Sequence, residues 1–360
     1  MQFTPTSRSD WPALHGARAL SILLVLACHL LPLGPKTVVD LNIAAGQLGM
    51  SIFFALSAFL ITHKLHTEPS LTTFAINRFF RIVPLVWLVL LIDFAWRLLS
   101  PAEANPSWPA ALAHLGFWVN NQPDLFLPET HHLWSLCVEV QFYILAGLAF
   151  TLGKRKGLWM LVFLGVLLAL HRALIGNYFN TTTPYRLDEI LIPLMVGLYW
   201  HQDGPRPAWV NRIKGLNPWF ALLALAVSCL APPIPWLFPL RPLLGSLFIA
   251  SLLLNPNGAG CRIFSSSHLR WVSEHSYALY ALHPFLQVTW LGSGDKWAMY
   301  LKRPLLLLAA AGLALLSART VERQCIQLGR WFNQRLRHRQ NPTSAQSVHA
   351  SHDTAQTKSV

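Results

Sequence analysis

Apolar segments of similar length follow one another along most of the chain, separated by short polar or basic connections. About ten of them are each roughly long enough to cross a bilayer as a helix. Their approximate limits are 14–33, 43–63, 82–100, 132–152, 157–176, 186–201, 217–232, 237–255, 272–292 and 303–321. The pattern predicts an all-α, polytopic integral membrane helix bundle with about ten transmembrane helices.

The connections alternate between basic and much less basic ones. The basic set contains Lys64, Arg78, Arg81, Lys154, Arg155, Lys156, Arg206, Arg212, Lys214, Arg262 and Arg270, and continues in the C-terminal segment with Arg323, Arg330, Arg335, Arg337 and Arg339. In the other set, the long loop at 101–131 has neither Lys nor Arg. Because basic loops remain in the cytoplasm, both termini are expected to be cytoplasmic, which requires an even number of spans.

Composition agrees with a membrane protein. The sequence is 53% hydrophobic and 12% charged, whereas a soluble domain has about 25% charged residues. The net charge of +13 lies mainly beside the spans, so it indicates contact with anionic lipid rather than with nucleic acid. The five Cys show no pairing pattern, and no disulfide framework or metal site is expected.

Three parts of the chain are expected. Residues 1–13 form a cytoplasmic N-terminus and residues 14–330 a membrane domain. Residues 331–360 form a basic and polar cytoplasmic tail without regular structure, because 340–360 is rich in Ser, Thr, Gln and His without an apolar period.

Four polar residues lie near the outer ends of predicted spans: His29, Glu139, Arg186 and Asp188. Charged groups in a span need a partner or a function, and we expect these four at similar depth in one outward-facing pocket. A neutral His held by a carboxylate is suited to removing a proton from a hydroxyl. Simple packing of the His and tethering of helices by Glu139 is the structural alternative.

Other polar side chains allow two interpretations each. Arg78 and Arg81 are three residues apart, so they share a helix face at the cytoplasmic surface, where they suit either phosphate groups or anchoring to anionic lipid. Arg18 lies near the inner end of the first span, where snorkelling is the simpler explanation. Tyr280 and His283 lie in the middle of the ninth span and are consistent with ordinary packing.

Taken in order, these segments resemble the membrane acyltransferase-3 family, the integral-membrane O-acyltransferases of surface polysaccharides and small glycosides. The matching segments are Leu14–Ala19 with His29, Ser51–Ile61, Asn77–Pro84, His132–Tyr143, Ser276–Pro284 and Glu322. The segment containing Trp134, Ser135 and Glu139 is the most specific of them. The chain departs from the family pattern at His15, where Asp is usual, and at Ala58, where Gly is usual.

The resemblance implies that an acyl group, most often acetyl, moves from acyl-CoA to a hydroxyl of a carbohydrate such as a cell-surface polysaccharide. It implies a bacterial cytoplasmic (inner) membrane protein with no tightly bound cofactor. His29 and Glu139 would be catalytic, and Arg78, Arg81 and Arg18 would bind acyl-CoA. The residues expected to line or support the acceptor pocket are Trp134, Ser135, Arg186, Asp188, Tyr280 and His283.

Several alternatives stay open at this point. A transporter or a flippase of a glycan or lipid-linked intermediate also fits ten spans with buried charges. Within acyl transfer, the acceptor is a polysaccharide or a small glycoside such as a macrolide, and the group is acetyl or succinyl. The acyl group passes either directly from the thioester to an alkoxide generated by His29, or through a covalent relay on His29 or a Ser. The oligomeric state and the effect of His15 and Ala58 are not predicted.

Overall fold

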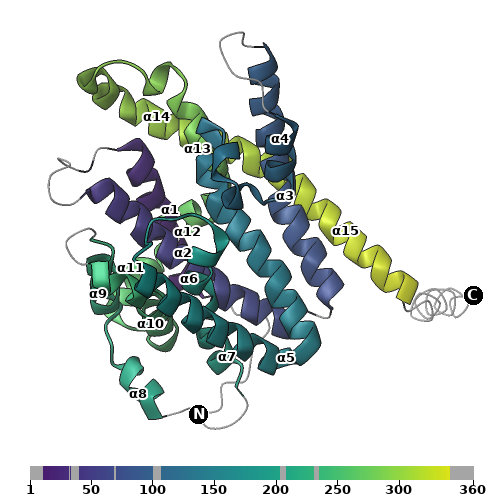
Figure 1. Cartoon of the computed structure of the whole chain (residues 1–360), viewed down its shortest axis with the longest axis vertical. Helices are drawn as coiled ribbons and strands as arrows, with labels where there is room; N and C mark the ends of the chain where they lie inside the picture. The colour runs from purple at the N-terminus through teal and green to yellow at the C-terminus, as the bar shows by residue number, and fades with distance from the viewer. Residues whose placement is uncertain are drawn as a thin grey trace, which may run out of the picture.

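The structure is a computed structural model that describes residues 11–31, 33, 40–68, 70–99, 107–202, 208–230 and 235–340. Regular structure in this part of the chain is helical throughout (Figure 1). The α-helices are α1 (Pro12–Leu30), α2 (Leu41–Thr67), α3 (Leu71–Leu99), α4 (Trp108–Leu115), α5 (Trp134–Ile175), α6 (Asp188–Leu191), α7 (Leu194–Trp200), α8 (Ala208–Lys214), α9 (Pro218–Ser228), α10 (Arg241–Leu254), α11 (Ala259–Phe264), α12 (Ser267–Glu274), α13 (Ser276–Gln287), α14 (Lys296–Ser317) and α15 (Arg323–Gln340). Short 3₁₀ turns include η3 (Pro128–Leu133) and η5 (Pro235–Leu240).

Within the described residues, six helical stretches are long and apolar enough to cross a membrane. They are Pro12–Leu30, Leu41–Thr67, Leu71–Leu99, Glu129–Ile175, Pro235–Leu254 and Trp297–Arg337. The prediction of a polytopic helical membrane protein is therefore confirmed at this level.

Helix α5 covers two of the predicted segments. It is broken at Lys154, whose φ of 49° and ψ of −130° lie outside the helical region. The predicted segment at 186–201 is likewise divided into α6 and α7 around Pro193, because a proline removes a backbone donor and clashes with the preceding turn.

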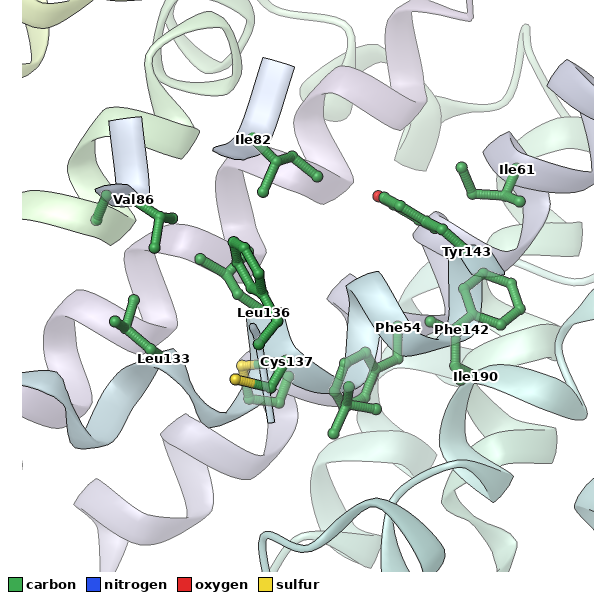
Figure 2. Packing of buried hydrophobic residues seen from close by; sticks show 14 of the residues in the cluster. Phe54, Ile61, Ile82, Val86, Leu133, Leu136, Cys137, Phe142, Tyr143 and Ile190 are labelled. Carbon is green, nitrogen blue, oxygen red and sulfur yellow. The ribbon is translucent and has the colours of Figure 1, made fainter. Parts of the chain in front are cut away.

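Helix α2 lies at the centre of the bundle. Ile52, Phe54, Ala58 and Phe59 on this helix are all fully buried. Figure 2 shows Phe54 in the apolar core that α2 shares with α3 and α5. A helix that is apolar on every side belongs in the interior of a bundle.

Small residues let α1 approach its neighbours closely. A methyl group added to Gly16 would lie 2.1 Å from the carbonyl oxygen of Phe264 in α11, and one added to Gly49 would lie 2.8 Å from the carbonyl oxygen of Ser21. The Ser21 hydroxyl donates a hydrogen bond of 2.8 Å to the carbonyl of Gly49. Close backbone approach through small residues is a common way to join helices in membranes.

The two sets of loops lie at opposite ends of the bundle. At the basic end, Trp11 packs against His63 and Trp200, and Arg155 donates to the carbonyl of Leu198. At the other end, the Asn42 side chain donates to the carbonyl of Cys28, so the end of α1 is joined to the beginning of α2. The loop with no Lys or Arg belongs to this second end. Its helix α4 begins at Trp108.

Helix α14 continues into α15 through one π-helical turn, Ala318–Glu322, and α15 lies along α3 (Figure 1). The helix extends to Gln340, so residues 331–340 are helical and differ in this respect from the expected unstructured tail. Residues 341–360 and 1–10 lie outside the described part of the chain.

Candidate active site

A cavity of about 90 Å³ lies in the middle of the bundle, between α1, α2, α3, α5 and α13. Its polar lining includes five residues singled out from the sequence: Arg18, Arg78, Arg81, Glu139 and Tyr280. The remaining walls are mostly apolar. An apolar cavity with a few convergent polar groups is the usual form of a small-molecule site.

Glu139 is the acidic group of this cavity, and it is almost completely buried, with 5% of its surface exposed. Its Oε1 accepts hydrogen bonds from the hydroxyls of Ser57 on α2 and of Tyr143, one helical turn further along α5. In Figure 2 the Tyr143 hydroxyl points to the space between Ile61 and Ile82, which also line the cavity. A carboxylate held by two donors is fixed in position and stays an acceptor.

Arg78 and Arg81 lie near the beginning of α3, and both belong to a second, more open cavity of about 420 Å³ as well. Within the described residues, the buried Nε of Arg78 has no hydrogen-bond partner. No carboxylate in that part of the chain forms an ion pair with Arg18, Arg78 or Arg81. The two cavities therefore meet at guanidinium groups that still have donors to offer.

His29 is exposed at the opposite end of the bundle, one residue before the end of α1. Its ring lies 5.1 Å from the ring of His283, and the His283 ring lies 5.2 Å from that of His132. His283 and His132 are buried. The Nδ1 of His283 is 2.8 Å from the carbonyl of Tyr280, to which it donates, so its Nε2 carries the lone pair in the neutral ring.

The structure does not bring His29 and Glu139 together. The carbonyl of Cys28, next to His29 in the chain, accepts a hydrogen bond from Asn42 of α2. Glu139 accepts a hydrogen bond from Ser57 of the same helix. These two α2 residues are fifteen positions apart, which corresponds to roughly 22 Å along a helix. The expectation that Glu139 orients His29 directly is therefore wrong in its geometry.

The reason lies in how the chain enters α5. The preceding turn η3 is already inside the bundle, since Thr130, His132 and Leu133 are all buried. Helix α5 consequently starts inside the bundle, and Glu139 lies further from the end that carries His29 than its place in the sequence indicates.

Polar side chains connect the two regions. Tyr280 lines the cavity of Glu139, and its hydroxyl donates to the carbonyl of His132. Because this uses its single proton, Ser135 is the donor in the 2.6 Å contact between the Ser135 and Tyr280 hydroxyls. The rings of Tyr280 and His132 are 5.2 Å apart. The sequence-predicted residues Ser135, Tyr280 and His283 thus lie between Glu139 and His29.

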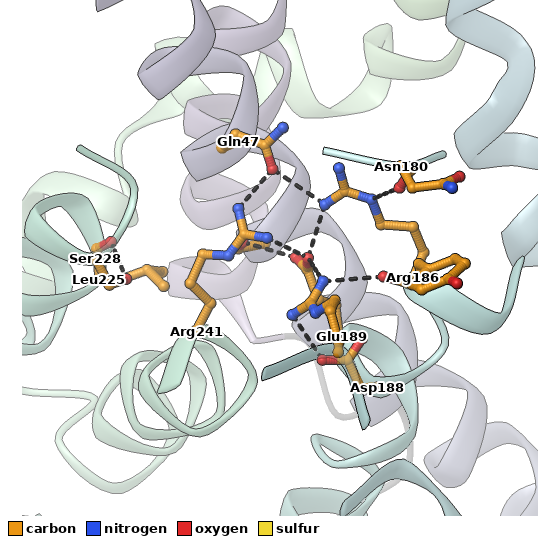
Figure 3. Close-up of polar contacts among 11 residues, drawn as sticks. Gln47, Asn180, Arg186, Asp188, Glu189, Leu225, Ser228 and Arg241 are labelled. Atoms are coloured by element: carbon orange, nitrogen blue, oxygen red, sulfur yellow. Dashed lines mark hydrogen bonds and ion pairs between the residues drawn. The ribbon is translucent and has the colours of Figure 1, made fainter. Parts of the chain in front are cut away.

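Arg186 and Asp188 belong to a separate, buried ion network (Figure 3), so they do not share a pocket with His29 and Glu139 as expected. Glu189 is its centre. Its Oε1 lies 2.9 Å from Arg172, 2.9 Å from Arg186 and 2.6 Å from Arg241. Asp188 is 2.6 Å from Arg172. All five side chains are at most 1% exposed.

This network joins α2, α5, α6 and α10. The Gln47 side chain on α2 accepts from Arg186 and Arg241, and Ser51 of α2 donates to Glu189 over 3.0 Å. The Arg186 guanidinium also lies over the Trp134 ring, 5.1 Å from its centre. Trp134 and Arg186 are therefore neighbours.

Sequence reasoning missed several of these residues. Tyr143 and Ser57 gave no signal on their own, because a hydroxyl in an apolar run is common in membrane helices. His132 was not among the residues expected in the site. Within the described residues, no cluster of His, Cys, Asp or Glu has the arrangement of a metal site.

Comparison with known proteins adds a separate line of information. The chain is 26% identical over 329 residues to the peptidoglycan O-acetyltransferase OatA of Listeria monocytogenes, which covers 79% of the chain and 51% of that protein. It is 27% identical over 314 residues to a putative O-acetyltransferase of Staphylococcus aureus, covering 76% of the chain and 50% of the relative. The O-acetyltransferase OatA of Staphylococcus aureus is 24% identical over 310 residues.

The chain spans about half the length of these curated relatives. No solved structure matches it significantly. The model of the family described as "Acyltransferase domain" matches residues 11–320, which is most of the chain and contains every residue of the central cavity. The chain therefore belongs to this acyltransferase family.

Proposed function

We propose that this protein is an integral-membrane O-acyltransferase that transfers an acyl group, most readily acetyl, from acyl-CoA to a hydroxyl of a carbohydrate in the cell envelope. The observation that carries the proposal is the central cavity, in which the buried carboxylate of Glu139 lies near Arg18, Arg78 and Arg81. The relatives named above are O-acetyltransferases, one of them acting on peptidoglycan by its name, which supports a carbohydrate acceptor.

The size of the cavity favours a small acyl group. Its volume of about 90 Å³ is smaller than the roughly 150 Å³ cavity that holds a benzene molecule. An acetyl thioester fits such a space, whereas a long acyl chain does not.

The proposed orientation follows from the loops. Lys64, Lys154 and Arg155 lie at the same end as the open cavity of Arg78 and Arg81, and we assign this end to the cytoplasm because basic loops remain there. The chain would then cross a bacterial inner membrane ten times, with both termini inside. A cytoplasmic thioester would meet the arginines, and the acceptor would meet His29 from outside.

In the proposed reaction, the carbohydrate hydroxyl gives its proton to a histidine at the outer end, and its oxygen attacks the acyl carbonyl. The bond from the carbonyl carbon to sulfur breaks, and the thiolate leaves as CoA after taking up a proton. His29 is the accessible base, and the Nε2 of the neighbouring His283 stabilises it or receives the proton from it.

We assign Glu139 and His29 to different ends of the reaction, which the distance between them supports. Glu139 would act on the donor side, where it fixes the hydroxyls of Ser57 and Tyr143 beside the thioester. The acyl group then reaches the outer end either on an extended donor arm or on a hydroxyl of the connecting path, such as Ser135 or Tyr280.

A membrane assay tests the proposal. Membranes that contain the protein should release CoA from acetyl-CoA when cell-wall carbohydrate is supplied, and should leave base-labile acetyl esters on it. His29→Ala and Glu139→Gln should each abolish the release at an unchanged protein level. His268→Ala, an exposed histidine at the basic end, is the matched control and should retain activity. Normal turnover by the His29 variant would contradict the assigned base.

The two routes for the acyl group differ in the absence of acceptor. A covalent relay predicts a burst of CoA equal to the amount of enzyme, and retention of radiolabelled acetyl on the protein. Direct transfer predicts neither.

A further inference from the structure

A charged recess lies on the basic end of the molecule, outside the central cavity. This is the open cavity of about 420 Å³, and α15 forms one of its walls. Its lining carries five basic side chains, Lys64, Arg78, Arg81, Arg330 and Arg337, and one acidic one, Glu68. Glu68 is already engaged, at 3.7 Å from Lys64 and as acceptor of a 3.2 Å hydrogen bond from Asn77.

The α15 wall has one face directed into the recess. Arg330, Asn333, Gln334 and Arg337 all line it, and their spacing of three, four and seven residues places them on the same side of a helix. Within the described residues neither arginine has a carboxylate partner. The Oδ1 of Asn333, on a residue that is 8% exposed, also lacks a donor there.

Packing fixes this wall against α3. The Phe332 and Phe80 rings stack at 5.5 Å, and Asn333 donates a 2.9 Å hydrogen bond to Asn77. Gly329 allows this close approach, since a methyl group there would lie 3.0 Å from the Phe80 side chain. The arginines of α15 are therefore held at a defined position relative to Arg78 and Arg81, which a helix attached only to lipid would not require.

We infer that α15 completes the binding site for the phosphorylated nucleotide end of the acyl-CoA donor, with Arg330 and Arg337 contacting its phosphate groups. This rests on the proposed function. The recess shares Arg78 and Arg81 with the central cavity, so a donor whose phosphates lie in the recess directs its thioester arm past these residues toward Glu139. In CoA the 3′-phosphate and the 5′-diphosphate are attached to the same ribose, so guanidinium groups on two adjacent helices can contact both.

The test measures equilibrium binding of radiolabelled acetyl-CoA to the full chain in nanodiscs of zwitterionic lipid. Arg330→Gln and Arg337→Gln should each weaken binding by about tenfold, the scale of one charge-assisted contact at an accessible site. Arg335→Gln is the matched control on the same helix, because Arg335 stacks on Trp331 and does not line the recess. Its affinity should stay within about twofold.

A second probe separates phosphate contact from a general effect on the fold. S-acetylpantetheine carries the thioester arm without any phosphate. Its own dissociation constant, obtained by competition with acetyl-CoA, should therefore be the same for Arg330→Gln and for the wild type. Arg330→Lys keeps the charge but loses the forked geometry, and should fall between the wild type and the Gln variant.

The outcomes are distinct. If the wild type binds acetyl-CoA and both Gln variants bind it equally well, the role of α15 is refuted while the proposed function stands. Loss of affinity that appears only in nanodiscs with anionic lipid would identify a lipid headgroup as the occupant and would also refute it. A wild type that binds no acetyl-CoA would instead overturn the proposed donor.

Discussion

The buried ion network around Glu189 gives a prediction about stability. In Glu189→Gln, three guanidinium groups lose the carboxylate that they share, and only Asp188 remains to balance them. Removing one partner of a buried ion pair costs about 3–5 kcal/mol, because the remaining charge stays away from water. Glu189 is 1% exposed and contacts three cations, so we expect its loss to reach at least this range.

The expected shift in thermal stability follows from this value. An unfolding entropy of about 2.1 cal/mol/K per residue corresponds to roughly 0.75 kcal/mol/K for a chain of 360 residues. A loss of about 4 kcal/mol then lowers the midpoint by roughly 5 °C. The measurement is thermal unfolding of the purified protein in detergent. The readout is the fraction of the protein that remains monodisperse after heating.

A double variant tests the cause. Glu189→Gln with Arg241→Met removes one positive and one negative charge, so the pair should cost at least about 1 kcal/mol less than the sum of the single variants. Arg270→Gln is the control, since the Arg270–Glu274 pair is half exposed, and its effect should stay below about 1 kcal/mol. If the stability losses of the two single variants simply add, or if Glu189→Gln has the same melting temperature as the wild type, the network does not stabilise the fold in this way.

Three further predictions concern packing, acyl length and orientation. Gly16→Ala should lower the melting temperature by several degrees, because a methyl group there meets the backbone of α11, whereas Gly312→Ala should be neutral or stabilising, since nothing lies within 4 Å of that position. Met50→Ala should raise butyryl transfer relative to acetyl transfer by enlarging the central cavity, and an unchanged ratio would separate that cavity from the acyl group. In a background lacking the native Cys, Ser107→Cys should react with an impermeant thiol reagent in intact cells and Lys156→Cys should not; the reverse result would invert the proposed orientation.

The positions of the helices were predictable because hydropathy depends on each segment alone. Each apolar stretch found in the sequence overlaps a helix, and the proline at 193 and the basic run at Lys154 coincide with interruptions. These features are local: a run of apolar residues, a missing backbone donor or a cluster of charges decides them without knowledge of the neighbouring helices.

The arrangement of the polar residues was not predictable in the same way. A sequence gives the approximate depth of a residue in a span but not the direction in which it points or the helix that it meets. Arg172 lies 17 residues before Glu189, and Arg241 lies 52 residues after it. Only the packing of α5, α6 and α10 brings the three side chains together. Glu139 shows a further limit, since η3 lies inside the bundle and this carboxylate lies near Arg18, Arg78 and Arg81 instead of near His29.

The position of Glu139 changes the path that the acyl group must follow in the proposed reaction. If Glu139 and His29 formed one pair, the acyl group would need to arrive at a single point near the outer surface. The α2 residues beside the two groups are roughly 22 Å apart, so under the proposed function the donor end and the acceptor end would each have their own polar residues, and the space between them would be part of the site. Tyr280 contacts both regions, because it lines the cavity of Glu139 and donates a hydrogen bond to the carbonyl of His132. Ser135, Tyr280 and His283, which were expected to line or support the acceptor pocket, lie between Glu139 and His29, so under the proposed function a group held beside Glu139 would pass them on its way to a base at His29.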